Sequence, residues 1–75
     1  MTNEEFIKNI EEILELKTKL TLDTKLDSLD VWDSLAMLTV ITFFNHTLGI
    51  SPTFQEMRAV KTVSDLITLS KNNDD

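Results

Sequence analysis

Residues 32–49 read WDSLAMLTVITFFNHTLG, and this stretch carries the strongest helix signal in the chain. Either Asp33 or Ser34 can cap the start of a helix, because a short polar side chain can accept a hydrogen bond from a free backbone N–H of the first turn. Gly49 readily adopts the left-handed conformation in which many helices end. The stretch therefore predicts a helix of about fifteen residues.

The side chains of this helix divide into a buried side and a polar side. At about 100° per residue, one side collects the apolar residues that we expect in the core: Met37, Val40, Ile41, Phe44 and Leu48. A polar stripe of Thr39, Thr42 and His46 lies opposite. Leu35 and Phe43 fall beside that stripe, so we predict that both remain partly exposed and can contact partners.

A long loop, residues 17–33, precedes this helix and shows no sustained helical stripe. Its leucines alternate with polar residues, as in a loop tied to a core, and a loop this long in a small domain usually has a function. Before the loop, Thr2 and Glu5 match a helix-opening capping box, after which apolar residues recur at helical spacing. We predict a first helix over about residues 3–16.

Two further helices are predicted after Gly49. Ser51 and Pro52 open a short one, since proline is tolerated at the first helical position. Its apolar side chains are expected in the core: Phe54, Met57 and Val60. Thr62 with Asp65 begins a last helix over about residues 63–70.

The composition favours one small all-α domain. The chain has 75 residues, 41% of them hydrophobic, with one Gly and one Pro. A chain this short can build only one modest core. We predict a four-helix bundle, three main helices and one short one, with the long loop between the first two. The domain would span residues 1–70, followed by a flexible tail at 71–75.

The charges and the cysteine count exclude several classes of function. Thirteen acidic and seven basic side chains give a net charge of −6, which disfavours nucleic acid as a partner. Residues 34–55 contain no Asp, Glu, Lys or Arg. Without cysteine, disulfides and thiolate metal sites are excluded. No stretch is long and apolar enough for a membrane span, and no basic-apolar leader opens the chain, so we expect a cytoplasmic protein.

The motif Trp32-Asp33-Ser34-Leu35, placed where a long loop meets a helix, resembles the attachment motif of acyl carrier proteins. The resemblance covers nearly the whole chain, because Ile50-Ser51-Pro52 and Thr62-Val63 stand where that family has its turn and its last helix. It implies an acyl-carrier-like bundle with a 4'-phosphopantetheine arm, derived from coenzyme A, on Ser34. It also implies that Asp33 helps to position the serine and the incoming transferase.

Elementary electrostatics supports Ser34 independently. A helix N-terminus offers free N–H donors and a favourable dipole to the phosphodiester of such an arm, and the arm would bring the thiol that the chain lacks. The same tripeptide occurs earlier as Asp27-Ser28-Leu29. A helix started at Ser28 would contain Asp30, Val31 and Trp32, so Ser34 fits better. A plain cap or turn residue is the alternative for both serines.

The predicted partner contacts depart from the family in one respect. Relatives that serve fatty acid synthesis usually carry several glutamates along the second helix, and this helix has none. Recognition would then rest on acidic residues of the loop region and on a more apolar helix face: Asp27, Asp30 and Asp33, with Leu35, Thr39, Phe43 and His46. Trp32 is either an exposed contact for partner enzymes or an anchor that pins the loop to the core. We therefore expect a dedicated loading enzyme in a specialised pathway, such as specialised lipid biosynthesis.

The leading hypothesis is a monomeric, non-enzymatic acyl carrier. Its partners would be a phosphopantetheinyl transferase, an acyl- or aminoacyl-loading ligase, and an acyl-accepting transferase or synthase. An aminoacyl or peptidyl carrier and an unmodified helical adaptor remain alternatives. A hydrolase based on Ser34 lacks a base placed by the sequence, and His46, the only histidine, has no neighbours at metal-ligand or triad spacing.

Overall fold

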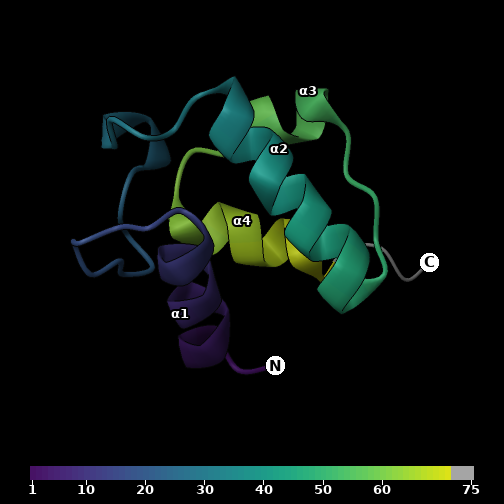
Figure 1. Ribbon diagram of the computed structural model, residues 1–75, viewed down its shortest axis with the longest axis horizontal. Coiled ribbons are helices and arrows are strands. Elements are labelled where there is room, and N and C mark those ends of the chain that lie inside the picture. Colours follow the sequence, from purple (N-terminus) through teal and green to yellow (C-terminus); the bar gives the residue numbers. More distant parts are fainter. Residues whose placement is uncertain (72–75) are drawn as a thin grey trace.

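The computed structural model describes residues 1–71 and forms a small helical bundle (Figure 1). Its helices are α1 (Asn3–Ile13), α2 (Ser34–Phe43), α3 (Phe54–Ala59) and α4 (Val63–Ser70). α1 packs against α2 and α4, and α2 also packs against α3. The described residues contain no strand, so the predicted all-α fold of three main helices and one short helix is confirmed. The predicted tail, apart from Lys71, lies outside the described residues.

Three of the four helices begin with a capping box. In α1 the Thr2 hydroxyl accepts from the Glu5 N–H at 3.1 Å, and the Glu5 carboxylate accepts from the Thr2 N–H at 2.9 Å. Thr62 and Asp65 form the corresponding pair at α4, as predicted. α3 uses Thr53 as its cap, so Pro52 precedes the helix and is not its first residue. The prediction for Pro52 was wrong because this capping box satisfies backbone donors that a start at proline would leave open.

α1 ends at Ile13, three residues before the predicted end. The Leu16 N–H donates to the Glu11 carbonyl at 2.9 Å and the Glu15 N–H donates to the Glu12 carbonyl at 3.1 Å, which is the pattern of a Schellman ending. Glu15 occupies the left-handed position with φ of 54°, where glycine is usual. The helix therefore stops through backbone bonding although the local sequence offers no glycine.

α2 continues into a π-helical turn, η2 (Phe44–Leu48), which ends at Gly49 with φ of 72°. The predicted extent of the second helix is thus confirmed, with a wider last turn. π-Helical turns are rare in proteins, and those that occur often lie at functional sites.

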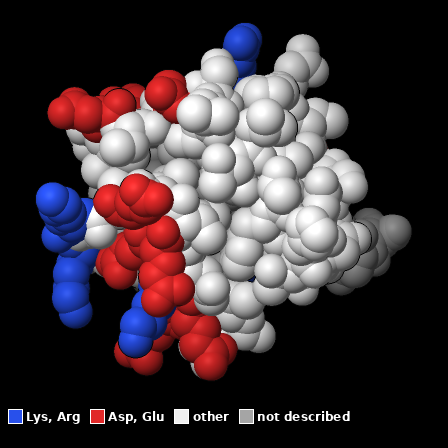
Figure 2. All heavy atoms as spheres, in the orientation of Figure 1, with Lys and Arg blue, Asp and Glu red and all other residues white. Residues whose placement is uncertain are grey.

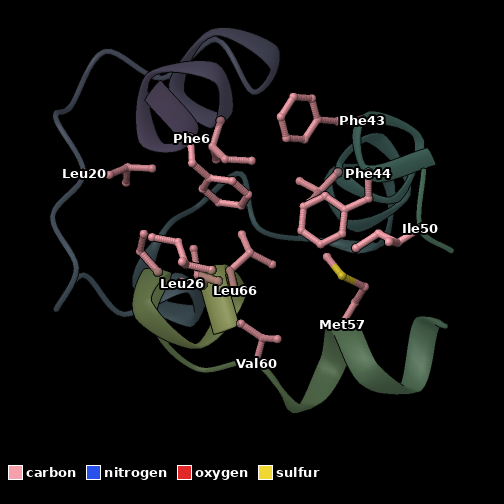
Figure 3. Close-up of a cluster of buried hydrophobic side chains, with 13 residues drawn as sticks. Phe6, Leu20, Leu26, Phe43, Phe44, Ile50, Met57, Val60 and Leu66 are labelled. Carbon is pink, nitrogen blue, oxygen red and sulfur yellow. The ribbon is translucent and has the colours of Figure 1, made fainter. Parts of the chain in front are cut away.

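Three phenylalanine rings occupy the centre of the core (Figure 3). The centroid of Phe6 lies 6.0 Å from that of Phe43, in edge-to-face geometry, and 5.8 Å from that of Phe44. Phe44 is fully buried, and Phe43 is 9% exposed. The expectation that Phe43 stays partly exposed was therefore wrong. Its side of α2 faces α1, and its ring packs against Phe6.

The other core predictions divide in a similar way. Val40, Met57 and Val60 are buried as expected. Phe54 is 41% exposed, which contradicts its predicted core position. Since Thr53 caps α3, Phe54 is the first residue of a six-residue helix and lies at its edge. The remaining predicted core residues of α2 are half-buried and pack against the core: Met37, Ile41 and Leu48.

The long loop is fastened to the core and to the start of α4. Leu20 and Leu26 are buried, the latter in a short 3-10 turn, η1 (Leu26–Ser28). The Leu26 N–H donates to the Lys61 carbonyl at 2.8 Å, and the Val63 N–H donates to the Thr24 carbonyl at 3.1 Å. These bonds hold the loop as a structured connection that leads to the N-terminus of α2. Among residues 1–71, no helix has the length and apolar character needed to cross a membrane.

We expect Glu15→Gly to raise the free energy of unfolding by about 0.5–1 kcal/mol. The substitution removes a left-handed penalty of about 1–2 kcal/mol, partly offset by the greater freedom of glycine in the unfolded chain. Glu15→Ala is the matched control, because it removes the same charge and keeps the penalty. Urea denaturation of the three proteins checks this, and equal stability of the two variants would contradict it.

Candidate functional site

The N-terminus of α2 is built around Asp33. The backbone of Asp33 is extended, with φ of −131°, and its Oδ1 accepts a hydrogen bond from the Ala36 N–H at 2.9 Å. The Asp33 carbonyl accepts from the Met37 N–H at 2.9 Å. Of the two residues that the sequence allowed as caps, the structure therefore selects Asp33, and Ser34 becomes the first residue of the helix.

Ser34 presents an accessible hydroxyl at this helix end. The residue is exposed, and its hydroxyl has no hydrogen-bond partner within residues 1–71. In the same part of the chain, the N–H groups of Ser34 and Leu35 also lack acceptors, because the first turn of a helix has no intrahelical partner for them and the Asp33 cap binds the Ala36 N–H. Free N–H groups at the positive end of a helix are suited to an anion. These groups fit a phosphodiester attached at Ser34 Oγ.

Ser28, the competing serine, lies in a different environment. Its hydroxyl donates to the Lys25 carbonyl at 2.6 Å, and it closes the three-residue turn η1. It does not stand at the start of an α-helix, so it lacks the free N–H groups found beside Ser34. The geometry agrees with the sequence argument in favouring Ser34.

The residues on either side of Asp33 and Ser34 differ in exposure. Trp32 is half-buried and packs against the core, which favours the anchor interpretation over that of an exposed contact. Leu35 is 71% exposed, in line with the expectation that it does not fill the core. An exposed leucine directly after the exposed serine leaves an apolar surface beside the hydroxyl.

A groove of about 410 Å³, which we call the proximal groove, opens beside this helix end between the last residues of α1 and the first turns of α2. Its lining comes from α1, the loop and α2: Ile13, Leu14, Glu15, Asp30, Val31, Asp33, Leu35, Ala36 and Thr39. Both sequence neighbours of Ser34 line it.

A second groove, the distal groove, lies farther along α2 and has a volume of about 380 Å³. It is lined by Ile13, Thr39, Thr42, Phe43, His46 and Thr47. The polar stripe predicted on the second helix, Thr39, Thr42 and His46, therefore lines this groove. An edge of the otherwise buried Phe43 lines it too. The Thr39 and Thr42 hydroxyls donate to the Leu35 and Leu38 carbonyls at 2.9 and 3.0 Å.

Charges are distributed unevenly around the two grooves. Figure 2 shows acidic and basic side chains gathered over the α1 and loop side of the molecule, and an uncharged surface over α2. Asp27 and Asp30 are exposed in the loop region, as is the cap Asp33. Thus α2 presents an uncharged face with an acidic border near Ser34.

The structure brings most of the predicted site residues to this face. The proximal groove is lined by Asp30, Asp33, Leu35 and Thr39. Thr39 also lines the distal groove, together with Phe43 and His46. Asp27 lines neither groove, and the half-buried Trp32 packs against the core. The sequence analysis missed Ile13, at the end of α1, and the two residues that follow it, Leu14 and Glu15. No local signal in the sequence shows that the end of α1 lies against α2.

Residues 1–71 hold no group of three side chains suited to bind a metal ion. Comparison with protein-family models, curated proteins and solved structures finds no match to this chain. A functional proposal therefore depends on the motif at Ser34 and on the geometry around it.

We expect Asp33→Ala to lower the free energy of unfolding by about 1 kcal/mol, the usual effect of losing a helix cap. Asp33→Asn is the matched control, because asparagine caps a helix about as well and carries no charge. Urea denaturation should place Asp33→Asn close to wild type. A loss in Asp33→Asn equal to that in Asp33→Ala would show that the charge, and not the cap, stabilises the helix end.

Proposed function

We propose that this protein is an acyl carrier that holds a 4'-phosphopantetheine arm on Ser34. The observation that carries the proposal is the exposed Ser34 hydroxyl within Trp32-Asp33-Ser34-Leu35, beside two N–H groups without acceptors in residues 1–71. A serine used only as a cap would accept a hydrogen bond from the first turn. Asp33 provides that bond here, which leaves Ser34 available for modification.

The modification is a phosphoryl transfer from coenzyme A. Ser34 Oγ would form a bond to the phosphorus that carries the pantetheine, the bond from that phosphorus to the nucleotide would break, and adenosine 3',5'-bisphosphate would leave. The transferase would accept the hydroxyl proton. The helix dipole and the two N–H groups favour the resulting phosphodiester over the neutral hydroxyl.

The arm supplies the thiol that carries an acyl group as a thioester, and this chain has no cysteine of its own. The protein's contribution is attachment, orientation and recognition. We accordingly assign it no catalytic role and propose that it acts as a monomer in the cytoplasm, with a transferase, a loading ligase and an accepting enzyme as partners.

A helical adaptor that never receives an arm is the second candidate. It is favoured by the exposed apolar side chains near Ser34, chiefly Leu35 and Val31, since clustered exposed apolar groups often mark protein-binding surfaces. Covalent modification distinguishes the two functions.

Intact-protein mass spectrometry after incubation with coenzyme A and a broad-specificity phosphopantetheinyl transferase tests the carrier function. We expect wild type and Ser28→Ala to gain one phosphopantetheinyl group and Ser34→Ala to gain none. Circular dichroism shows whether each variant is folded. No gain in folded wild type would support the adaptor, and a gain that persists in Ser34→Ala would transfer the site to Ser28.

The uncharged α2 face also predicts poor loading by generic fatty acid synthase enzymes, which we expect to read carboxylates on the second helix of their carriers. The double variant Thr42→Glu, His46→Glu introduces two carboxylates at exposed positions of this face. It should load faster, by about tenfold if the charges steer the encounter. Thr42→Gln, His46→Gln is the uncharged control. Efficient loading of the wild type by the generic enzymes would contradict the expectation of a dedicated ligase.

A further inference from the structure

The proximal and distal grooves lie next to each other along α2, and we call the two together the α1–α2 track. They share two lining residues, Ile13 from the end of α1 and Thr39 from the middle of α2. Together they extend from Asp33, at the start of α2, to Thr47 in the π-helical turn. The track therefore begins next to the proposed attachment residue and ends near the opposite end of the helix.

The proposed attachment residue lines neither groove itself, but its two sequence neighbours line the proximal groove. Asp33 and Leu35 both line the proximal groove, and Ser34 lies between them at the first position of the helix.

The length of the track suits the arm. Phe43 lies nine positions after Ser34, which corresponds to a rise of about 14 Å along an α-helix. From phosphorus to sulfur, the arm has about as many bonds along its chain as four or five peptide residues. Fully extended, a chain of that length spans about 15 Å. An arm in the track would bring its thiol close to Phe43, at the start of the π-helical turn, and the attached acyl group to His46 and Thr47.

The lining matches the chemistry of the arm, which alternates short apolar segments with two amides. Ile13, Ala36 and the edge of Phe43 provide apolar surface. The Thr39 and Thr42 hydroxyls already donate to helix carbonyls, so their free lone pairs can accept from amide N–H groups. The distal groove contains no carboxylate, ammonium or guanidinium among its lining residues, which suits an uncharged acyl group.

We propose that the phosphopantetheine arm lies along the α1–α2 track, with its thiol at Phe43 and a short uncharged acyl group over the π-helical turn. This inference rests on the proposed modification of Ser34. The competing position is the other side of α2, where the exposed side chains of Leu38 and, on α3, Phe54 offer apolar surface.

Isotope-filtered NMR on the modified protein distinguishes these positions. The protein is labelled with ¹³C and ¹⁵N, and the arm, transferred from unlabelled coenzyme A, is not. Mass spectrometry first confirms one added arm, so a failure of the proposed function appears before the arm is located. We expect cross-relaxation from the arm to the side chains of Ile13, Thr39 and Phe43.

Two arginine variants form a matched pair at consecutive positions of α2, because Thr39 lines both grooves and Leu38 lines neither. Thr39→Arg fills the track where the two grooves meet and should abolish the cross-peaks to Phe43. Leu38→Arg adds the same side chain outside the track and should leave them unchanged. The ¹H–¹⁵N spectrum shows whether each variant keeps the wild-type fold.

Three results would overturn the proposal. Cross-peaks to Leu38 and Phe54 would place the arm between α2 and α3. Contacts confined to residues 33–35 would show an arm that extends into solvent and would leave the track to a protein partner. Cross-peaks to Phe43 that persist in folded Thr39→Arg would show that the arm reaches the ring by another route.

Discussion

The packing of Phe6 against Phe43 and Phe44 is the contact on which the grooved surface of α2 depends. Large rings that meet at their edges bury much apolar area and hold their elements at a fixed spacing, here α1 against α2. Because Phe43 points toward Phe6, the polar residues beside it remain on the open side of α2. The end of α1 then borders the same surface through Ile13. The two grooves are thus a consequence of how the core is filled.

The position of Ser34 depends on a second constraint, namely the contacts that hold the loop between α1 and α2 against the rest of the domain. Twenty residues separate α1 from α2, and leaving them mobile would let the start of α2 vary. Burial of Leu20 and Leu26, the backbone bonds to the start of α4, and the packing of Trp32 remove that freedom. Asp33 then enters the helix in the extended conformation that a capping residue needs. The bonded loop and the filled core together place the exposed hydroxyl of Ser34 at the start of α2.

The sequence predicted the features that local chemistry determines. The capping pairs Thr2–Glu5 and Thr62–Asp65 and the stop at Gly49 need only residues close in the chain, and the structure confirms all three. Thr53 and Glu56 carried the same local signal and were overlooked because Pro52 offered a competing start. The burial of Phe43 was not predictable in this way. Apolar residues occur nearly all round α2, so periodicity determines its inward direction poorly, and contact with α1 decides it. The grooves require that same contact between distant segments, which explains why their α1 residues were missed.

The carboxylates of Asp30 and Asp33 lie near Ser34 and would repel the negative charge of the phosphodiester proposed for this residue. Asp33 stabilises the helix whose N-terminus would hold the phosphate, yet its charge repels that phosphate. The helix dipole, worth about 0.3–1 kcal/mol at an exposed terminus, and two N–H groups offset part of the repulsion. Repulsion would also act on coenzyme A as it approaches, so the proposed transferase would have to supply cationic groups that screen Asp30 and Asp33. The acidic border would then select a basic enzyme at the encounter, and the helix end would stabilise the product after that enzyme leaves.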